Sequence, residues 1–283
     1  MRPEDFRTAG TEMRAIRQIS LVRLPGWPKQ SRIVRSGEAF ISSNGVRMKQ
    51  DLQSQFRESR EWAEIPPFTL PRGEALRRLV SARPPGSLNA GYDLLRTRLL
   101  GMTTEHDWRR IGLIQPRQGP ATAVAAMNLA LSLARRPSLK ILLADLDLAA
   151  PRVASGFGMK MAPDLAASLR ARADLFGLLK RLGGNLAVLA NARPDPMAGD
   201  TLQEPGTGRT IGALVATLQP DVALFILPPM LGGDAGLAGL ALVEAAVMVL
   251  DGRRTTAADV RACERLDDWD TPMIGLFLAE AER

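Results

Sequence analysis

The stretch IGLIQPRQGPATAVAAMNLALSLARRPSLKILLADLD, residues 111–147, decides the fold. It begins with a short apolar run at 111–114, passes through a loop rich in proline and glycine, and enters an Ala/Leu-rich segment over 121–135. A second apolar run at 141–144 ends at two aspartates. Continuous apolar runs on either side of a helix are typical of parallel strands that are buried on both faces. The stretch therefore predicts a β-α-β unit.

The same alternation continues toward the C-terminus. Further apolar runs lie at 186–189, 222–227, 245–250 and 273–278. Helices are expected between and before the runs, at 92–100, 121–135, 165–182, 210–218, 237–242 and 256–266. We therefore predict an α/β domain with a mostly parallel sheet, helices on both faces and right-handed crossovers. A ligand crevice is expected at the carboxyl ends of the strands.

The charge of the chain is concentrated in its first third. Residues 1–89 contain 16 Lys+Arg and 9 Asp+Glu, and residues 90–283 contain 21 of each sign, so the net charge of +7 lies before residue 90. This excludes a uniformly basic protein that coats nucleic acid along its folded surface. The first segment also holds 8 of the 20 prolines and little periodicity. We predict a basic, Pro-rich, largely disordered arm (1–89) and one domain (90–283).

The cysteine content and the apolar stretches of the sequence limit where in the cell the protein is expected. The one cysteine, Cys263, excludes an internal disulfide and fits a reducing compartment, and its predicted helical position favours packing over catalysis. No stretch supplies the ~20 clean apolar residues of a membrane helix. We expect a cytoplasmic protein. Trp27 and Trp62, in the predicted arm, are either docking anchors or local packing residues.

The loop after the first strand would bind phosphate if it read G-x-x-x-x-G-K-[ST], because its amides and its lysine surround the phosphates and its hydroxyl holds magnesium. Residues 115–124 read QPRQGPATAV instead. The loop has the right length and leads into a suitable helix, but it contains no lysine. Pro120 also removes one backbone donor from the anion-binding loop.

The order of short motifs from about residue 90 to 280 resembles one family. The motifs are NLA at 128–130, ILLADLD at 141–147, proline at 151, FG at 157–158, NLAVL at 185–189, DV at 221–222, PP at 228–229, DA at 234–235, TT at 255–256 and GLFL at 275–278. This order is similar to that of the bacterial tyrosine kinases (BY-kinases, CpsD/CapB type), which are cytoplasmic P-loop partners of polysaccharide co-polymerases. The resemblance implies a deviant P-loop NTPase fold related to MinD and ParA, and ATP-dependent tyrosine phosphorylation as the family's activity.

The phosphate-binding residues of that family are replaced in this chain. When the motif is aligned on Asn128, the family's lysine falls on Thr122 and the following serine on Ala123. Loss of the lysine removes the charge that stabilises a transferring phosphoryl group, and loss of the hydroxyl removes a magnesium ligand. Arg117 is the one residue that could supply a residual phosphate contact.

The carboxylates and the base-reading residue are only partly kept. Asp145 and Asp147 correspond to the pair that handles magnesium and the nucleophile in the family, and they remain weak metal candidates here. The next magnesium-linked aspartate is Ile226, and the asparagine that reads adenine is Ala279. The predicted degenerate nucleotide site comprises Gly119, Thr122, Ala123, Asn128, Asp145, Asp147, Ile226 and Ala279.

The residues that the family uses for its ring and for autophosphorylation have also changed. In the E-x-x-R-x-x-R helix that builds the ring, the glutamate maps to Ala90 and the first arginine to Asp93, and only Arg96 is kept. The C-terminal tyrosine cluster is absent, since the single tyrosine is Tyr92.

These losses predict a pseudokinase with no catalytic residues and no resident cofactor or metal. The expected role is a regulator or scaffold of exopolysaccharide or adhesin synthesis and export, peripherally associated with the inner membrane. Its expected partner is a membrane-embedded polysaccharide co-polymerase (Wzz/Wzc type), with the basic arm near anionic lipid. The alternative is a divergent ATP-binding tyrosine kinase or ATPase that still binds Mg-ATP or Mg-ADP weakly. A third hypothesis is a ParA-like DNA-associated protein, which is disfavoured because such proteins need ATP-driven dimers.

Overall fold

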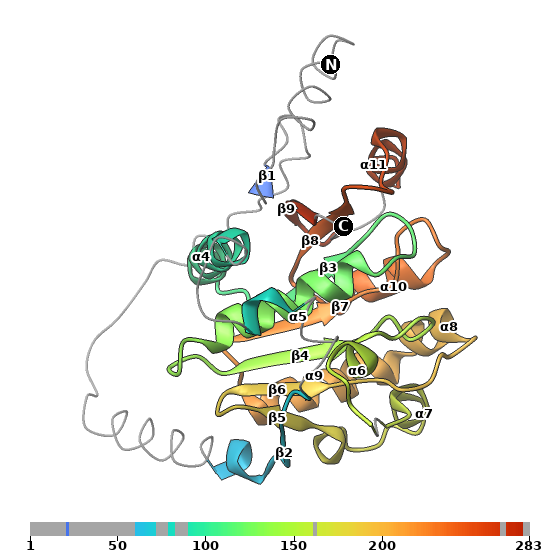
Figure 1. Cartoon of the computed structure of the whole chain (residues 1–283). Coiled ribbons are helices and arrows are strands. Elements are labelled where there is room, and N and C mark those ends of the chain that lie inside the picture. The colour runs from blue at the N-terminus through green and yellow to red at the C-terminus, as the bar shows by residue number, and fades with distance from the viewer. Residues whose placement is uncertain are drawn as a thin grey trace, which may run out of the picture.

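The computed structural model describes residues 21–22, 60–71, 79–82, 90–160, 163–266 and 270–279. They form a nine-stranded sheet in the order β1-β9-β8-β3-β7-β4-β6-β5-β2 (Figure 1). The strands are β1 (Leu21–Val22), β2 (Pro67–Phe68), β3 (Arg110–Ile114), β4 (Ile141–Asp145), β5 (Lys180–Leu182), β6 (Leu186–Leu189), β7 (Val222–Ile226), β8 (Ala245–Asp251) and β9 (Met273–Ala279). The helices are α4 (Ala90–His106), α5 (Ala121–Ala134), α6 (Val153–Gly156), α7 (Leu165–Arg170), α8 (Ala198–Gln203), α9 (Pro205–Leu218), α10 (Ala235–Leu240) and α11 (Ala257–Glu264), with 3-10 turns η1 (Val80–Ala82) and η2 (Phe176–Leu178).

The six central strands run parallel, which confirms the predicted fold class. β3 pairs with β7 and β8, β4 pairs with β7 and β6, and β9 pairs with β8, all in parallel. Each apolar run of the sequence forms one of these strands. Short strands complete the edges, where β5 is antiparallel to β6 and β1 is antiparallel to β9.

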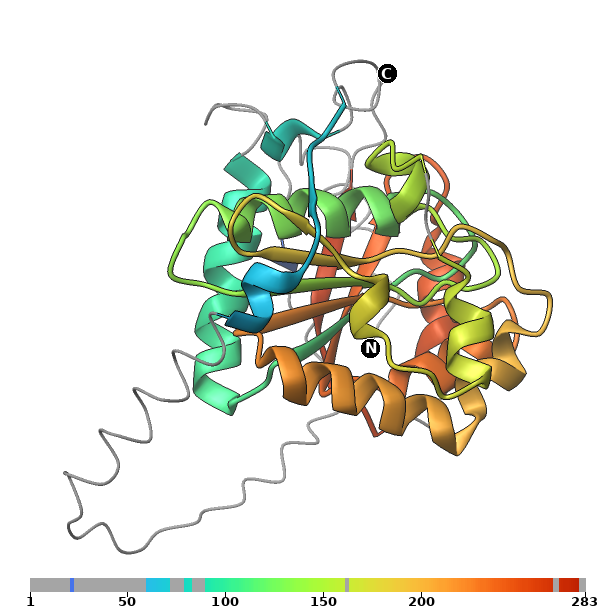
Figure 2. The same ribbon diagram turned by 90° about the horizontal axis from the view of Figure 1, so that it is seen from below.

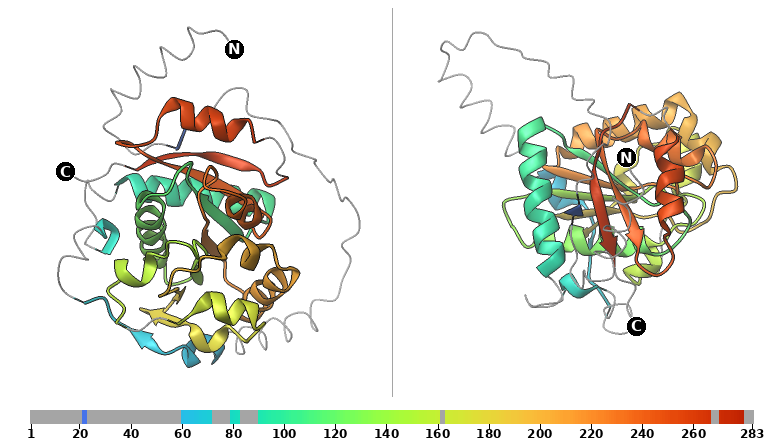
Figure 3. Two further views of the ribbon diagram at one scale, coloured as in Figure 1. Left: turned by 90° about the vertical axis from the view of Figure 1, so that its right-hand side faces the viewer. Right: turned by 90° about the horizontal axis from the view of Figure 1, so that it is seen from above.

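Helices cover both faces of the sheet, so the strands are apolar on both sides. In β7, Val222, Leu224 and Ile226 pack into the core under α5, whereas Ala223 and Phe225 pack into the core under α9. Figure 2 shows the sheet between α5 above and α9 below. α4 and α11 lie on opposite sides of β8 and β9 (Figure 3). Burial on both faces is the physical reason for the unbroken apolar runs.

The predicted helix over 165–182 is wrong beyond its first turns. α7 is capped by Asp164, whose side chain accepts a hydrogen bond from the Ala167 N–H (2.9 Å), and the helix ends at Arg170. Arg172 adopts a left-handed conformation (φ 54), which stops the helix. Residues Lys180–Leu182 then form β5, because pairing with β6 satisfies their backbone groups at the edge of the sheet.

The predicted boundary at residue 90 is also wrong, because two earlier segments belong to the packed domain. Trp62 and Ile65 are buried, and Trp62 Nε1 donates a hydrogen bond to the Leu218 carbonyl (2.9 Å) at the end of α9. β2 pairs with β5, and η1 contributes Val80 to the core under α5. Trp62 is therefore a packing residue. Apart from β1, which pairs with β9, the rest of the predicted arm, with Trp27, lies outside the described residues.

Two further findings concern Cys263 and the helices. Cys263 is fully buried in the core, and burial raises the pKa of its thiol to about 12, so the predicted packing role is confirmed. Among the described residues, no helix is both long and apolar enough to cross a membrane.

Candidate functional site

Of the predicted site residues, Asp145 and Ile226 come together at the carboxyl ends of neighbouring strands, whereas Ala279 ends β9, which β8, β3 and β7 separate from β4. Asp145 ends β4, and its Cα pairs in register with Ile226 of β7, which in turn pairs with Leu113 of β3. Because side chains alternate along a strand, Asp145 follows Ile141 and Leu143 onto the face covered by α5. Asp145 and Ile226 therefore lie side by side under the helix that carries Thr122 in its first turn.

Asp145 is a fully buried carboxyl group with one unused oxygen. Its Oδ2 accepts hydrogen bonds from the backbone N–H groups of Arg152 (2.8 Å) and Val153 (2.9 Å). Its Oδ1 is buried and accepts none. Burial, opposed by these hydrogen bonds and reinforced by the nearby Asp147, raises the pKa of Asp145 to about 7. Among the described residues, no positively charged side chain pairs with this carboxylate.

Asp147 is bound to the loop that replaces the phosphate-binding loop. The Gln118 amide Nε2 donates to Asp147 Oδ2 (2.8 Å), while Oδ1 is buried without a partner. Burial raises the pKa of Asp147, although the hydrogen bond from Gln118 acts in the opposite direction. One oxygen of Asp147 therefore accepts its hydrogen bond from Gln118, which is an uncharged donor. Sequence reasoning missed this residue, because glutamine in a loop carries no signal of its own.

The other polar side chains of the 115–119 loop also bind within the protein. Gln115 Nε2 donates to the Gly119 carbonyl (3.0 Å), and Arg117 Nε donates to Asp259 Oδ1 (2.6 Å) on α11. The backbone N–H of Met230 donates to the Gln115 carbonyl (2.9 Å), which ties the loop to the segment after β7. A phosphate contact by Arg117 stays a prediction, and in this structure its Nε is engaged by Asp259.

Asp259 is a strong partner for Arg117. Hydrogen bonding from the Thr256 backbone N–H, followed by that from Arg117, lowers the pKa of Asp259 to about 2. Thr256 and Asp259 also form the capping box that starts α11. The loop is therefore joined to a helix end by a charged hydrogen bond.

Residues at the start and middle of α5 have mainly packing roles. Thr122 is buried and its hydroxyl has no hydrogen-bond partner, and Ala123 is buried beside it. Asn128 is fully buried; its Oδ1 accepts from the Ser81 N–H (3.0 Å) and its Nδ2 donates to the Val124 carbonyl (2.9 Å). Asn128 thus holds η1 against α5.

The last two predicted positions offer no polar group. Ile226 and Ala279 are buried apolar side chains, and Ala279 pairs with Asp251 at the end of β9. Neither side chain has a polar atom that could bind magnesium or hydrogen-bond a base.

The residues present offer Mg-ATP two carboxylates but no lysine in the 115–124 loop. Magnesium is bound through carboxylates and phosphate oxygens in near-octahedral geometry. In the part of the chain that the structure describes, no group of three or more His, Cys, Asp or Glu side chains is placed to hold a metal ion. Among the described residues at this site, Asp145 Oδ1, Asp147 Oδ1 and Thr122 Oγ1 are buried oxygens without a hydrogen-bond partner.

The sheet, the loop into α5 and the two aspartates at the carboxyl end of β4 define a mostly parallel α/β fold with a loop and a helix start beside these carboxylates. Among solved structures, the chain is similar to the kinase domain of the Escherichia coli tyrosine kinase ETK (TM-score 0.65, 19% identity, 76% of this chain and 89% of that chain). It is also similar to the BceF tyrosine kinase domain (0.62, 19%, 84% and 89%) and the VpsO kinase domain (0.60, 21%, 73% and 97%). These similarities confirm the predicted fold of bacterial tyrosine kinase domains. No model of a known protein family and no curated protein matches the sequence.

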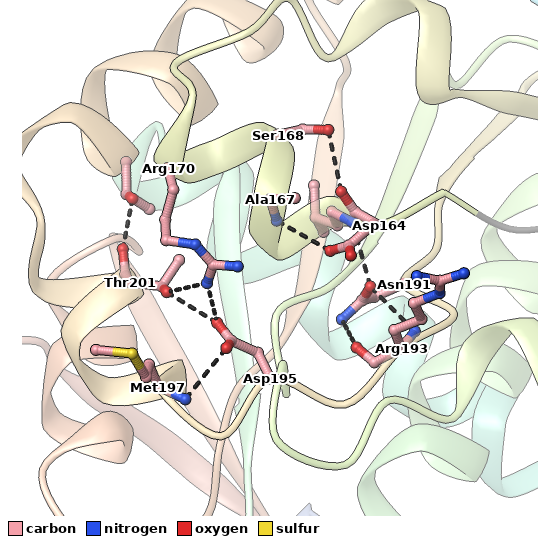
Figure 4. A network of polar contacts seen from close by, with 11 residues as sticks. Asp164, Ala167, Ser168, Arg170, Asn191, Arg193, Asp195, Met197 and Thr201 are labelled. Carbon is pink, nitrogen blue, oxygen red and sulfur yellow. Dashed lines mark hydrogen bonds and ion pairs between the residues drawn. The ribbon is translucent and has the colours of Figure 1, made fainter.

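A second polar network braces the loop after β6 (Figure 4). Asp195 Oδ2 accepts hydrogen bonds from Arg170 Nη1 (2.6 Å) and Thr201 Oγ1 (2.8 Å), and its Oδ1 accepts from the Met197 N–H (3.1 Å). Burial alone would raise the pKa of Asp195, but hydrogen bonds from Thr201, Met197 and Arg170 together lower it below its usual value. The network links α7 to α8.

Replacing Asp195 by asparagine is expected to lower the free energy of unfolding at pH 7 by about 1.5–3 kcal/mol, because charge-assisted hydrogen bonds are lost. The folded-state pKa of Asp195 is depressed, so the carboxylate stabilises the fold above its unfolded pKa and stops doing so as pH falls through the folded value. The difference between the proteins should therefore shrink below about pH 4. Urea unfolding across this range measures it, and Asp200→Asn, at an exposed position of α8, is the control. A difference that does not change with pH would contradict the charged role.

Proposed function

We propose that this chain is a pseudokinase, a non-catalytic regulator or scaffold in the synthesis and export of an exopolysaccharide or adhesin. It would lie in the cytoplasm at the inner membrane and bind the cytosolic part of a polysaccharide co-polymerase. The proposal rests on the fold of bacterial tyrosine kinase domains together with the changed nucleotide site.

The observation that carries the proposal is the chemistry of the 115–124 loop. Thr122 replaces the lysine, and the loop side chains Gln115, Arg117 and Gln118 are hydrogen-bonded to the protein itself. A phosphate-binding loop works because its donors and its lysine are available to the ligand. This loop instead connects β3, Asp147 and α11, which supports a structural role.

The N-terminal charge supports a position near anionic lipid. Residues 1–59, which precede the packed segment at 60–71, contain 11 Lys+Arg and 6 Asp+Glu, a net charge of +5. Each basic residue close to an anionic membrane contributes about 1 kcal/mol of attraction. This segment would hold the domain at the membrane surface where a co-polymerase resides.

Co-purification tests the scaffold role directly. The full chain is expected to retain the cytosolic segments of a co-polymerase at low salt, with no change on adding Mg-ATP. A variant in which five arginines before residue 59 are changed to glutamine should lose vesicle binding and keep the co-polymerase. Unchanged polysaccharide output in a strain that lacks the chain would contradict the proposed function.

The alternative function, a divergent ATPase or tyrosine kinase, is favoured by one observation. Asp145 and Asp147 each keep one unpartnered oxygen at the end of β4. Carboxylate oxygens at this place could hold a magnesium ion brought in by a nucleotide. Incorporation of labelled phosphate into the chain or a partner, lost in Asp145→Asn, would establish this alternative.

A further inference from the structure

The loop that follows β6 turns polar side chains inward and apolar side chains outward. Asn191 and Asp195 are buried. Asparagine and aspartate are mostly exposed in proteins, and buried polar groups and exposed large apolar groups are the arrangements that call for an explanation. The exposed residues of this loop are called here the 192–197 ridge, and they are Ala192, Arg193, Pro194, Pro196 and Met197.

The two buried side chains hold the ridge in one conformation. Asn191 Oδ1 accepts a hydrogen bond from the Leu165 N–H (3.2 Å), and Asn191 Nδ2 donates to the Arg193 carbonyl (2.9 Å). The Asp195 N–H donates to the Leu148 carbonyl (2.8 Å), and the Asp195 side chain makes the contacts drawn in Figure 4. A surface that is fixed in advance loses little conformational freedom when a partner binds to it.

Met197 is exposed although its position favours a polar residue. Its side chain is 56% exposed, more than any other large apolar side chain of the described residues, and it points away from Asp195 in Figure 4. Met197 is also the N-cap residue of α8, where a serine, threonine, aspartate or asparagine would accept a hydrogen bond from the helix. The methionine side chain makes no such bond. Methionine therefore gains neither burial nor a capping hydrogen bond at this place.

The chemistry of the ridge favours a protein partner with aromatic side chains. Thioether sulfur makes favourable contacts with aromatic rings, and exposed prolines dock on aromatic-lined surfaces. The Arg193 side chain is exposed and forms no ion pair among the described residues, so it is available to a carboxylate. Asp200 on α8 is exposed as well and offsets this charge, which disfavours an anionic membrane as the partner of this surface.

We propose that the 192–197 ridge is a docking surface for a protein partner, and that it contacts a segment in which aromatic side chains lie next to a carboxylate. The aromatic rings cover Pro194, Pro196 and Met197, and the carboxylate pairs with Arg193. This inference rests on the proposed scaffold function for the choice of partner, which is the cytosolic part of the co-polymerase.

Calorimetric titration of the full chain with the purified cytosolic segments of a co-polymerase tests the ridge. Met197→Ser should weaken binding about tenfold, which corresponds to about 1.4 kcal/mol. Because serine is a preferred N-cap residue, the same variant should keep or raise the melting temperature, whereas loss of a packing residue would lower it. The matched control is Leu94→Ser at an exposed position of α4, and it should bind like the natural chain.

Cross-linking identifies what covers the ridge. Met197→Cys can be labelled selectively with benzophenone maleimide, because the natural Cys263 is buried. We expect cross-links to the aromatic segment of the partner that the equally labelled Leu94→Cys does not give.

The outcomes separate the ridge from the scaffold function. If the natural chain binds the co-polymerase segments and Met197→Ser binds them equally well, or if both labelled variants give the same cross-links, the ridge proposal is overturned and the scaffold function stands. If the natural chain does not bind the segments, both proposals are contradicted.

Discussion

Replacing Trp62 by alanine is expected to lower the free energy of unfolding by about 3–5 kcal/mol, the usual cost of removing a fully buried aromatic side chain. Trp62 is 4% exposed and packs with Ile65 in the core that includes Leu218. Its indole N–H also donates to the Leu218 carbonyl, the last of α9. Alanine would leave a cavity and an unpaired carbonyl. Urea unfolding of the full chain, followed by circular dichroism, measures the change.

Two variants make this test specific. Trp62→Phe keeps most of the apolar contact but removes the hydrogen bond, and it should cost about 1–2 kcal/mol. Trp108→Ala removes a partly buried tryptophan that stacks on His106, and it should cost less than half as much as Trp62→Ala. A loss below about 1 kcal/mol for Trp62→Ala would show that the segment at 60–71 is only loosely attached. The predicted domain boundary at residue 90 would then be correct after all.

Replacing Asp145 by asparagine is expected to stabilise the chain at pH 8 and to have little effect near pH 4. The folded-state pKa of Asp145 is about 7, well above the ordinary aspartate pKa of 3.8, so the folded protein binds this proton more tightly than the unfolded chain does. Stability contributed by the protonated carboxyl is fully present below the unfolded pKa and is lost as pH rises through the folded pKa. Asparagine is neutral at every pH, so the variant does not lose this stability as pH rises. At pH 8 the gain should be on the order of 3 kcal/mol.

The measurement is the difference in unfolding free energy between the two proteins from pH 4 to pH 8. Asp174→Asn, at an exposed position between α7 and η2, controls for the loss of one negative charge. A destabilised Asp145→Asn variant at pH 8 would contradict this explanation. It would mean that the charged carboxylate has a partner in solution, such as a bound cation.

The strands could be predicted because burial on both faces leaves a local signal. The run at 222–227 reads as a strand without reference to any neighbour, and β7 occupies that place. The helix over 165–182 could not be predicted correctly, because its composition favours a helix. Its end is set by the backbone conformation of Arg172 and by pairing of β5 with β6.

In the candidate site, too, some features could be predicted from local sequence and others depend on contacts between distant residues. Asp145, Asp147, Ile226 and Ala279 could be placed from the sequence, because the ends of parallel strands meet at one edge. Their partners could not. Gln118 is 29 residues from Asp147, Asn128 is 47 from Ser81, and Arg117 is 142 from Asp259. Contacts at such separations depend on the complete fold, and no local pattern encodes them.

Calorimetric titration of the full chain with Mg-ATP and Mg-ADP tests the central claim most directly. The resemblance to the bacterial tyrosine kinases places Thr122 and Ile226 where that family has a lysine and a third carboxylate, so we predict no binding heat at millimolar nucleotide for the natural sequence. The variant Thr122→Lys plus Ile226→Asp should gain binding, and the neutral variant Thr122→Met plus Ile226→Asn should not. Saturable binding of Mg-ATP by the natural chain, abolished by Asp145→Asn, would contradict the account and identify a working nucleotide site.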